Sequence, residues 1–161
     1  MRASNAAMYE TVWTPVRIFV LAFGLVYTLV GILGFVGTLV TDQTGFVDGT
    51  GELLDIFAID PVHNVVHLAA GVLAILAAAR NDLSRFFAQI FGVVFLLLAI
   101  WGFALVGATG TEIEEILDIL PVNAADNWLH LVTAGLLLFF GLVPWAWRTP
   151  VVGGAPRPVQ R

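Results

Sequence analysis

Residues 52–71 read ELLDIFAIDPVHNVVHLAAG, and residues 115–134 read EILDILPVNAADNWLHLVTA. Shifted by 63 positions, the two stretches share an E-[LI]-L-D-I segment and an N-x-x-H-L segment, which begins at Asn64 and at Asn127. A second shift, of 68 positions, aligns the apolar segments that precede these stretches. Self-similarity at a constant spacing is typical of a repeated structural unit. The sequence therefore predicts two copies of one unit, each made of a helix, an acidic loop and a second helix.

The composition predicts that lipid surrounds much of this chain. Hydrophobic residues make up 59% of its 161 residues and charged residues 12%, whereas soluble domains are about 45–50% apolar and about 25% charged. A membrane-spanning helix needs about 20 mostly apolar residues, and four segments meet this length: 17–40, 61–79, 86–107 and 127–147. The predicted fold class is an all-α integral membrane protein, a four-transmembrane-helix bundle built from two parallel helix-pair repeats.

The boundaries of the two repeats follow from these segments. The first repeat is predicted at 17–80 and the second at 81–148, between tails at 1–16 and 149–161. Because each repeat contains two spans, both enter the membrane in the same orientation. We expect each E-[LI]-L-D-I segment to form one short helical turn at the outer interface. Small residues let helices pack closely in lipid, and the glycines predicted to do so are Gly24, Gly31, Gly34 and Gly71.

The arginines predict the orientation in the membrane. All seven lie in the N-terminal region, in the central turn at 80–85 or in the C-terminal region, which four spans place on one side. The two long loops, 42–60 and 108–126, contain none. Positively charged residues are enriched in cytoplasmic segments. Both termini are therefore predicted in the cytoplasm and both acidic loops outside, in a bacterial-type cell membrane.

Four polar residues inside the predicted spans form two matching pairs, Asn64 with His67 and Asn127 with His130. Residues at i and i+3 share a helix face, and polar side chains inside a membrane are costly enough to indicate a structural or functional role. One interpretation is that the two pairs hydrogen-bond to each other and to the backbone, which would align the second and fourth helices. A proton relay is a second interpretation.

Two further interpretations give the histidines a ligand. His67 and His130, on symmetry-related helices, suit axial ligation of a haem or another macrocycle. A divalent metal at the outer face would use His63, His67, Asp126 and His130, because histidines at i and i+4 suit zinc geometry. Asn64 stands where a metalloprotease motif has its glutamate, so this pattern does not predict hydrolysis. The sequence alone assigns no cofactor.

The pattern DPVHNVVHLAAG at 60–71, with the weaker DNWLHL at 126–131 and the four-span layout, resembles a bacterial membrane family known only as domain of unknown function 4383. The resemblance covers roughly residues 17–147, and the N-x-x-H-L-x-x-G run from Asn64 is its most specific part. It implies a four-helix membrane protein and carries over no catalytic residue. The second repeat has Asp126 where the first has His63, so the two halves differ chemically.

Several function classes are excluded by what the sequence lacks. It contains no cysteine, so it has no disulfide or thiolate metal site, and no basic stripe that would bind nucleic acid. We expect a non-enzymatic membrane protein, a structural or accessory subunit that contacts other membrane subunits or a second copy of itself. The competing hypotheses are a haem- or metal-binding protein that uses the paired histidines, and a small transporter or channel that works only as an oligomer.

Overall fold

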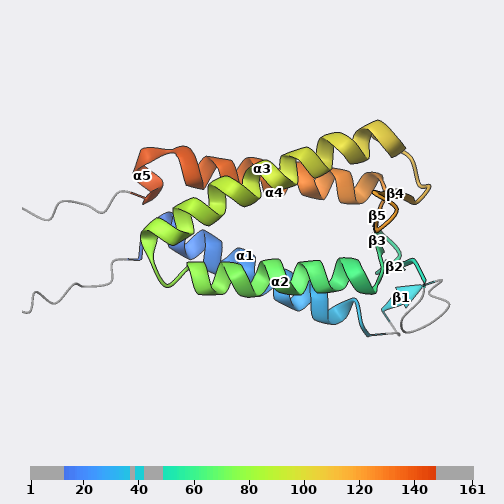
Figure 1. Cartoon of the computed structure of the whole chain (residues 1–161), viewed down its shortest axis with the longest axis horizontal. Coiled ribbons are helices and arrows are strands. Elements are labelled where there is room, and N and C mark those ends of the chain that lie inside the picture. Colours follow the sequence, from blue (N-terminus) through green and yellow to red (C-terminus); the bar gives the residue numbers. More distant parts are fainter. Residues whose placement is uncertain (1–12, 37–38, 42–48, 148–161) are drawn as a thin grey trace, which may run out of the picture.

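The computed structural model describes residues 13–36, 39–41 and 49–147 (Figure 1). Its helices are α1 (Pro15–Leu33), α2 (Pro61–Ala77), α3 (Asn81–Val106), α4 (Ala124–Leu142) and the short α5 (Pro144–Trp147). Its strands are β1 (Val40–Thr41), β2 (Gly51–Leu53), β3 (Phe57–Ile59), β4 (Glu114–Ile116) and β5 (Leu120–Val122). Most of the two predicted tails and part of the first predicted loop lie outside the described residues.

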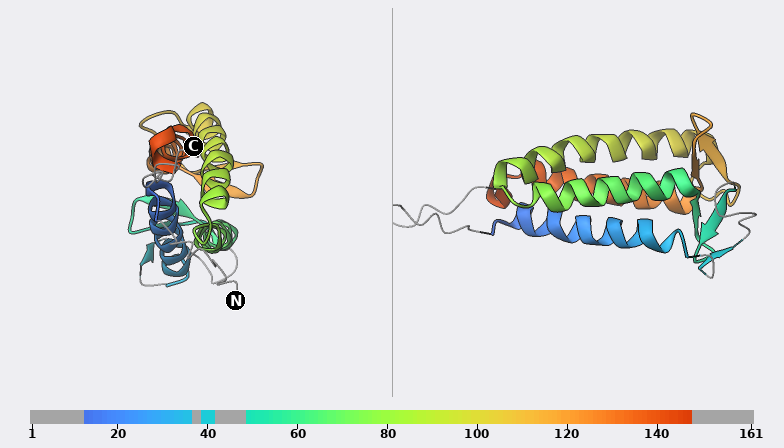
Figure 2. Two further views of the ribbon diagram at one scale, coloured as in Figure 1. Left: turned by 90° about the vertical axis from the view of Figure 1, so that its left-hand side faces the viewer. Right: turned by 60° about the horizontal axis from the view of Figure 1, so that its bottom comes forward.

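The four long helices run side by side along the longest axis of the molecule (Figure 1 and Figure 2). α1 packs closely on α2, and α3 packs closely on α4, whereas contacts between these two pairs are sparser. One end of the molecule holds the turn between α2 and α3 together with α5, and we call it the turn end. The described strands lie at the opposite end, the hairpin end.

The outward faces of the helices are apolar, as expected for a membrane protein. α1, α3 and α4 are each long and apolar enough to cross a membrane. α2 is a shorter apolar helix of 17 residues, which makes it about 26 Å long. Leu25, Leu97 and Val132, on three different helices, are each more than half exposed. So much exposed aliphatic surface is compatible with hydrocarbon around the protein rather than water.

Capping residues explain where α2 and α4 begin. The Asp60 carboxylate accepts a hydrogen bond of 2.6 Å from the backbone N–H of His63. Pro61 is the first helical residue of α2, a position where the missing N–H of proline has no partner to lose. At α4, Asn123 and Asp126 form a reciprocal capping box. These caps hold the side chains in the first two turns of both helices at a defined depth.

Three predicted helix boundaries are wrong. α1 stops short of Val40, which lies in β1. The predicted turn at 80–85 is shorter, because α3 already begins at Asn81. The fourth span is divided at Val143, whose ψ of 120° is extended, since a residue that precedes proline avoids the helical conformation. Pro144 then starts α5.

The E-[LI]-L-D-I segments form β-hairpins, and the predicted helical turns are wrong. Leu54 and Asp55 have φ angles of 57° and 60°, and Leu117 and Asp118 have φ angles of 59° and 55°. Each turn begins with two consecutive residues of positive φ, whose twist suits an antiparallel pair, and three residues in all, 54–56 or 117–119, lie between the paired positions. β2 pairs with β3, and β4 pairs with β5, on either side of these turns. The all-α prediction therefore fails at the hairpin end.

Glycines bring the helices of each pair close together. All four predicted packing glycines lie in the contact between the α1 segment and α2: Gly24, Gly31, Gly34 and Gly71. Gly34 lies against the side chain of Asn64, and Gly102 of α3 lies against the side chain of Asn127 in the same way. A β-carbon at either glycine would overlap the asparagine. Each pair therefore depends on one glycine where an asparagine side chain meets the neighbouring backbone.

Arginines close the turn end of each pair. Arg17 is buried, and its guanidinium donates to the carbonyl oxygens of Ala78 and Ala79, just after α2, at 2.9 Å each. Arg85, near the start of α3, donates to the carbonyl oxygen of Gly141 near the end of α4 at 3.3 Å. The last carbonyls of a helix lack intrahelical partners and carry partial negative charge, so a cation stabilises them.

Candidate functional site

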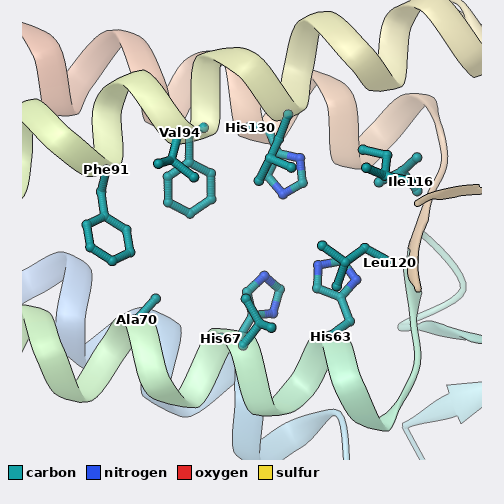
Figure 3. Close-up of a pocket in the computed structure, with 12 residues that line it drawn as sticks. His63, His67, Ala70, Phe91, Val94, Ile116, Leu120 and His130 are labelled. Atoms are coloured by element: carbon teal, nitrogen blue, oxygen red, sulfur yellow. The ribbon is translucent and has the colours of Figure 1, made fainter. Parts of the chain in front are cut away.

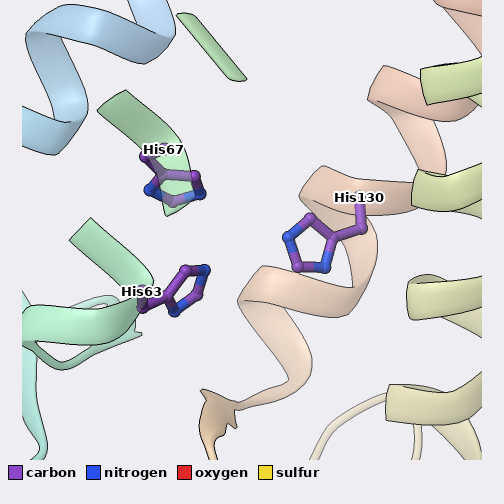
Figure 4. Close-up of side chains that lie close together, drawn as sticks. All are labelled: His63, His67 and His130. Carbon is purple, nitrogen blue, oxygen red and sulfur yellow. The ribbon is translucent and has the colours of Figure 1, made fainter. Parts of the chain in front are cut away.

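Three histidines from two helices point into a common space near the hairpin end (Figure 4). His63 and His67 lie on α2, four residues apart and therefore on one face of the helix. His130 lies on α4, across the interface between the two helix pairs. We call these three residues the histidine cluster.

The imidazole nitrogens of the histidine cluster are close enough to share one ligand. One nitrogen from each ring lies within 4.8 Å of the others. The ring centroids of His63 and His67 are 4.4 Å apart, and those of His63 and His130 are 6.3 Å apart. A tetrahedral ion with nitrogen ligands at about 2.0–2.1 Å holds those nitrogens about 3.4 Å from one another. Small side-chain rotations would bring the three rings to that separation.

The histidines line a small cavity between α2, α3, α4 and the second hairpin, which β4 and β5 form (Figure 3). Its volume is about 60 Å³. A cavity holds one water molecule from roughly 10–15 Å³ upward, so the space is large enough for an ion with a further small ligand. The other lining residues are apolar: Val66, Ala70, Phe91, Val94, Phe95, Leu98, Ile116, Leu120 and Val122. We call this space the histidine cavity.

All three histidines are buried, with exposed fractions of 3% for His63, 8% for His67 and 4% for His130. Within the described part of the chain, the Nδ1 atom of each ring has no hydrogen-bond partner. A buried polar atom without a partner costs about 1–3 kcal/mol, and nearly all such atoms in folded proteins are paired. Three of them around one cavity favour a ligand site over ordinary core packing.

Asp126 is a predicted metal ligand, but the structure engages its carboxylate elsewhere. Asp126 is the third residue of α4, the position that His63 has in α2. It accepts hydrogen bonds from the backbone N–H groups of Asn123, at 3.1 Å, and of Ala58 in β3, at 2.9 Å. Among the described residues, the group placed to hold a metal consists of the three histidines. Asp126 instead joins the second helix pair to the first hairpin, which β2 and β3 form.

The two predicted Asn–His pairs are divided between two interfaces. Asn64 Nδ2 donates to the carbonyl oxygen of Gly34 at 2.9 Å, and Asn127 lies against Gly102. Residues at i and i+3 are about 60° apart around a helix. That angle is enough to turn each asparagine toward the other helix of its own pair, while each histidine faces the opposite pair. The predicted hydrogen bond to the backbone is therefore present at Asn64, whereas the described residues show no hydrogen bond between the two Asn–His pairs.

Sequence reasoning missed the aromatic side of the cavity. The ring of Tyr27 in α1 stands edge-on to His67, with 5.1 Å between centroids, and its hydroxyl donates to Thr133 Oγ1 at 3.4 Å. Phe95 of α3 packs 5.4 Å from the Tyr27 ring. The tyrosine is a usable signal, because a buried phenol needs a hydrogen-bond partner. The sequence contains no comparable signal that the second hairpin lines the cavity, because it predicts a helical turn there.

The donor set determines what the cluster can bind. Imidazole nitrogens suit zinc, copper, iron and nickel ions, and three protein ligands leave a fourth position open on a tetrahedral ion. A haem suits the site less well, because a flat macrocycle between two axial histidines needs far more room than a cavity of about 60 Å³. The site therefore fits a single ion better than a porphyrin.

Comparison with known protein families assigns the chain to one family. Residues 17–143 match the family described as a domain of unknown function, DUF4383. The match covers more than half of the chain, and the protein belongs to this family. No curated protein and no solved structure matches it. The family description assigns no activity, so the site itself has to indicate the function.

Proposed function

We propose that this protein is a membrane protein that binds a transition-metal ion through His63, His67 and His130. The observation that carries the proposal is the meeting of three buried imidazoles, from two helix pairs, with nitrogens within 4.8 Å of one another. Zinc and copper ions are the best candidates, because both accept imidazole ligands and small coordination numbers. The fourth ligand would enter the histidine cavity from outside the cluster.

The ion would join the two helix pairs. His63 and His67 belong to the first pair and His130 to the second, and contacts between the pairs are otherwise sparse. A ligand that binds only the folded state stabilises it by about 2.7 kcal/mol when its concentration is about 100 times its Kd. The metal would then act structurally, which agrees with the non-enzymatic role expected from the sequence. The accessory-subunit role and the lack of enzymatic activity stay predictions.

Four membrane crossings, with the turn end in the cytoplasm, form part of the proposal. Arg17, Arg80 and Arg85 all belong to the turn end, as the positive-inside rule requires. Thr109 is exposed and lines a surface hollow at the hairpin end. Because the natural chain has no cysteine, Thr109→Cys should react with a membrane-impermeant reagent in intact cells. Reaction only after permeabilisation would reverse the orientation.

The two helix pairs are proposed to be copies of one unit, arranged as parallel repeats. The hairpin turns at 54–55 and 117–118 share their backbone conformation and are 63 positions apart. Arg17 and Arg85, 68 positions apart, each donate to carbonyls at the end of the following long helix. Both spacings equal the shifts seen in the sequence. The metal would therefore lie between two copies, near their interface.

Metal binding by the purified protein tests the proposal. The full chain, purified in detergent with a tag that contains no histidine, would be stripped with a chelator and dialysed separately against Zn²⁺ and Cu²⁺. We expect one ion per chain for at least one metal, measured by elemental mass spectrometry. His67→Ala should lose this ion, because two histidines from different pairs would remain.

The small number of histidines makes the metal-binding signal specific to the cluster. The three histidines of the chain all belong to the cluster, so no other imidazole can produce the signal. Glu115→Gln removes an exposed carboxylate at the hairpin end and should bind metal as the natural protein does. Equal binding by His67→Ala and the natural protein would contradict the proposal. Failure of the natural protein to bind either ion would contradict it as well.

A further inference from the structure

The first hairpin is held against the start of α4. Asn123 Nδ2 donates to the carbonyl oxygen of Ile56, at 2.8 Å, and to Glu52 Oε1, at 3.3 Å. Asp126 accepts from the backbone N–H of Ala58 in the same hairpin. Together these bonds hold the first hairpin against the start of α4. A solute that entered between the first hairpin and α4 would have to break them.

The cavity comes close to the surface on its α3 side instead. Val94 lines the histidine cavity and is nevertheless 42% exposed on the outside of the molecule. Val66 of α2 also lines the cavity and is 43% exposed. The wall there is one side chain thick. In the proposed orientation, hydrocarbon lies on the other side of that wall.

An apolar hollow of about 570 Å³ adjoins this thin wall, between α3 and the second hairpin. Its lining residues are all apolar, and those on the α3 side away from the wall include Leu97, Ile100, Trp101 and Ala104. Four lining residues of the hollow also line the histidine cavity, and we call them the threshold residues: Val94, Leu98, Ile116 and Leu120. The threshold residues separate the histidines from the bilayer side of the protein.

We infer that the histidine site takes its fourth ligand from the bilayer: the carboxylate of a single-chain lipid of the fatty-acid type. The inference rests on the proposed metal site. A polar metabolite would have to shed its water at an apolar threshold, whereas a lipid already in the membrane brings its chain to the hollow. A carboxylate oxygen is an ordinary zinc ligand, and its negative charge offsets that of the ion in an apolar surrounding.

The size of the two spaces narrows the choice of lipid. A cavity of about 60 Å³ has room for a carboxyl group beside an ion, and a phosphodiester head group with its substituents is bulkier. The hollow has room for several methylene groups of one chain. Leu97 and Trp101, which line it, are 60% and 44% exposed. A chain that passed over them would remain in contact with the bilayer.

Photo-crosslinking in vesicles tests this inference. Metal-loaded protein in phosphatidylcholine vesicles would be exposed to a fatty acid with a diazirine in its chain, irradiated, and mapped by peptide mass spectrometry. We expect cross-links to concentrate on residues of the hollow, and an excess of unlabelled oleate to suppress them. Removal of the metal should weaken capture, because the carboxylate would lose its strongest partner.

Two variants and a matched control sharpen the test. Val94→Trp fills the threshold and should lower capture roughly tenfold or more, because overfilling a packed space is strongly unfavourable. Val93→Trp is the control, since Val93 is 48% exposed and lines neither space. Ala104→Trp fills the hollow away from the threshold, and its exposed position leaves the packed core intact. It should lower capture as well.

The outcomes separate this inference from the proposed function. Cross-links spread evenly over all lipid-facing helices, without competition by oleate, would overturn it. If that result came from protein that binds metal, the proposed metal site would stand and only the lipid ligand would fall. If cross-links concentrated in the hollow of a protein that binds no metal, the proposed function would fail. The inference would fail with it, because no ion would be present to take a carboxylate as its fourth ligand.

Discussion

The hairpin ends of α2 and α4 have the same backbone design and different chemistry. Each helix follows a hairpin with a three-residue turn, and each has a capping residue, Asp60 or Asn123, that accepts from the third helical residue. That third residue is His63 in α2 and Asp126 in α4. The His63 ring lines the histidine cavity, whereas the Asp126 carboxylate accepts from backbone N–H groups. One position thus serves the proposed metal site in one helix and the cap in the other.

The comparison shows why the cluster has three members. If Asp126 turned to a metal, the N–H groups of Asn123 and Ala58 would lose their acceptor. Buried donors without partners cost about 1–3 kcal/mol each, which would offset much of the gain from one more ligand. The capping role therefore disfavours Asp126 as a fourth protein ligand. The proposed ion lies nearer the first helix pair, which provides two of its three ligands.

The largest effect is expected at the capping position. Asp126→Ala should lower the free energy of unfolding by about 3 kcal/mol, because two buried N–H groups lose their acceptor. Thermal unfolding in detergent, followed by circular dichroism, measures this. Glu112→Ala is the control and should change stability little, because Glu112 is exposed and does not have a positive φ angle. Equal losses in the two variants would remove the structural role assigned to Asp126.

At the equivalent position in α2, the effect should depend on metal. With metal at about 100 times its Kd, we expect the natural protein to gain about 2.7 kcal/mol of stability over the stripped form. His63→Ala should lose most of this gain, while the α2 cap persists because it uses the backbone N–H of residue 63. The measurement is unfolding with and without Zn²⁺ or Cu²⁺. A metal-induced gain that survives the substitution would exclude His63 as a ligand.

The glycine–asparagine contacts should behave alike if the two pairs are copies. Gly34→Ala and Gly102→Ala should each cost about 2 kcal/mol of unfolding free energy, because the added methyl group overlaps Asn64 or Asn127. Gly135→Ala is the control. A β-carbon there meets nothing within 4 Å, so helix propensity alone should add about 0.5–1 kcal/mol. Losses that differ strongly between Gly34 and Gly102 would show that the pairs have diverged.

The smallest expected effect is a difference in unfolding free energy between variants of two arginines at the turn end. Arg17→Gln should cost about 1 kcal/mol more unfolding free energy than Arg85→Gln. Arg17 donates to two carbonyls from a buried position, and Arg85 donates to one, where each such bond contributes about 1 kcal/mol. Comparing the two unfolding midpoints in one detergent tests this. Equal losses would mean that the extra bond of Arg17 contributes nothing measurable.

Much of the fold could be predicted because hydropathy acts over whole segments. Three of the four predicted spans overlap helices long and apolar enough to cross a membrane, and the fourth overlaps the shorter α2. The hairpins could not be predicted in this way. Their turns place Leu54 and Asp55 at positive φ, where glycine or asparagine is the usual signal. Pairing of β2 with β3 overrides that local preference.

The site could be predicted in part, for a similar reason. Histidines in apolar segments are visible in the sequence, and all three histidines predicted for a metal site do meet. The sequence does not show which way the Asp126 side chain points. That direction depends on a hydrogen bond to Ala58, 68 positions away, and on the hairpin that presents that N–H group. Side-chain direction at such a position is determined by tertiary contacts, which periodicity does not encode.

The most direct test of the metal site is X-ray absorption spectroscopy on protein isolated from its native membrane without a histidine tag. We predict a zinc or copper edge with three nitrogen neighbours at about 2.0–2.1 Å and the outer-shell scattering of imidazole. His130→Ala should remove this signal. Protein that carries no transition metal would contradict the proposed site, and so would an ion bound only by oxygen or a spectrum unchanged in His130→Ala.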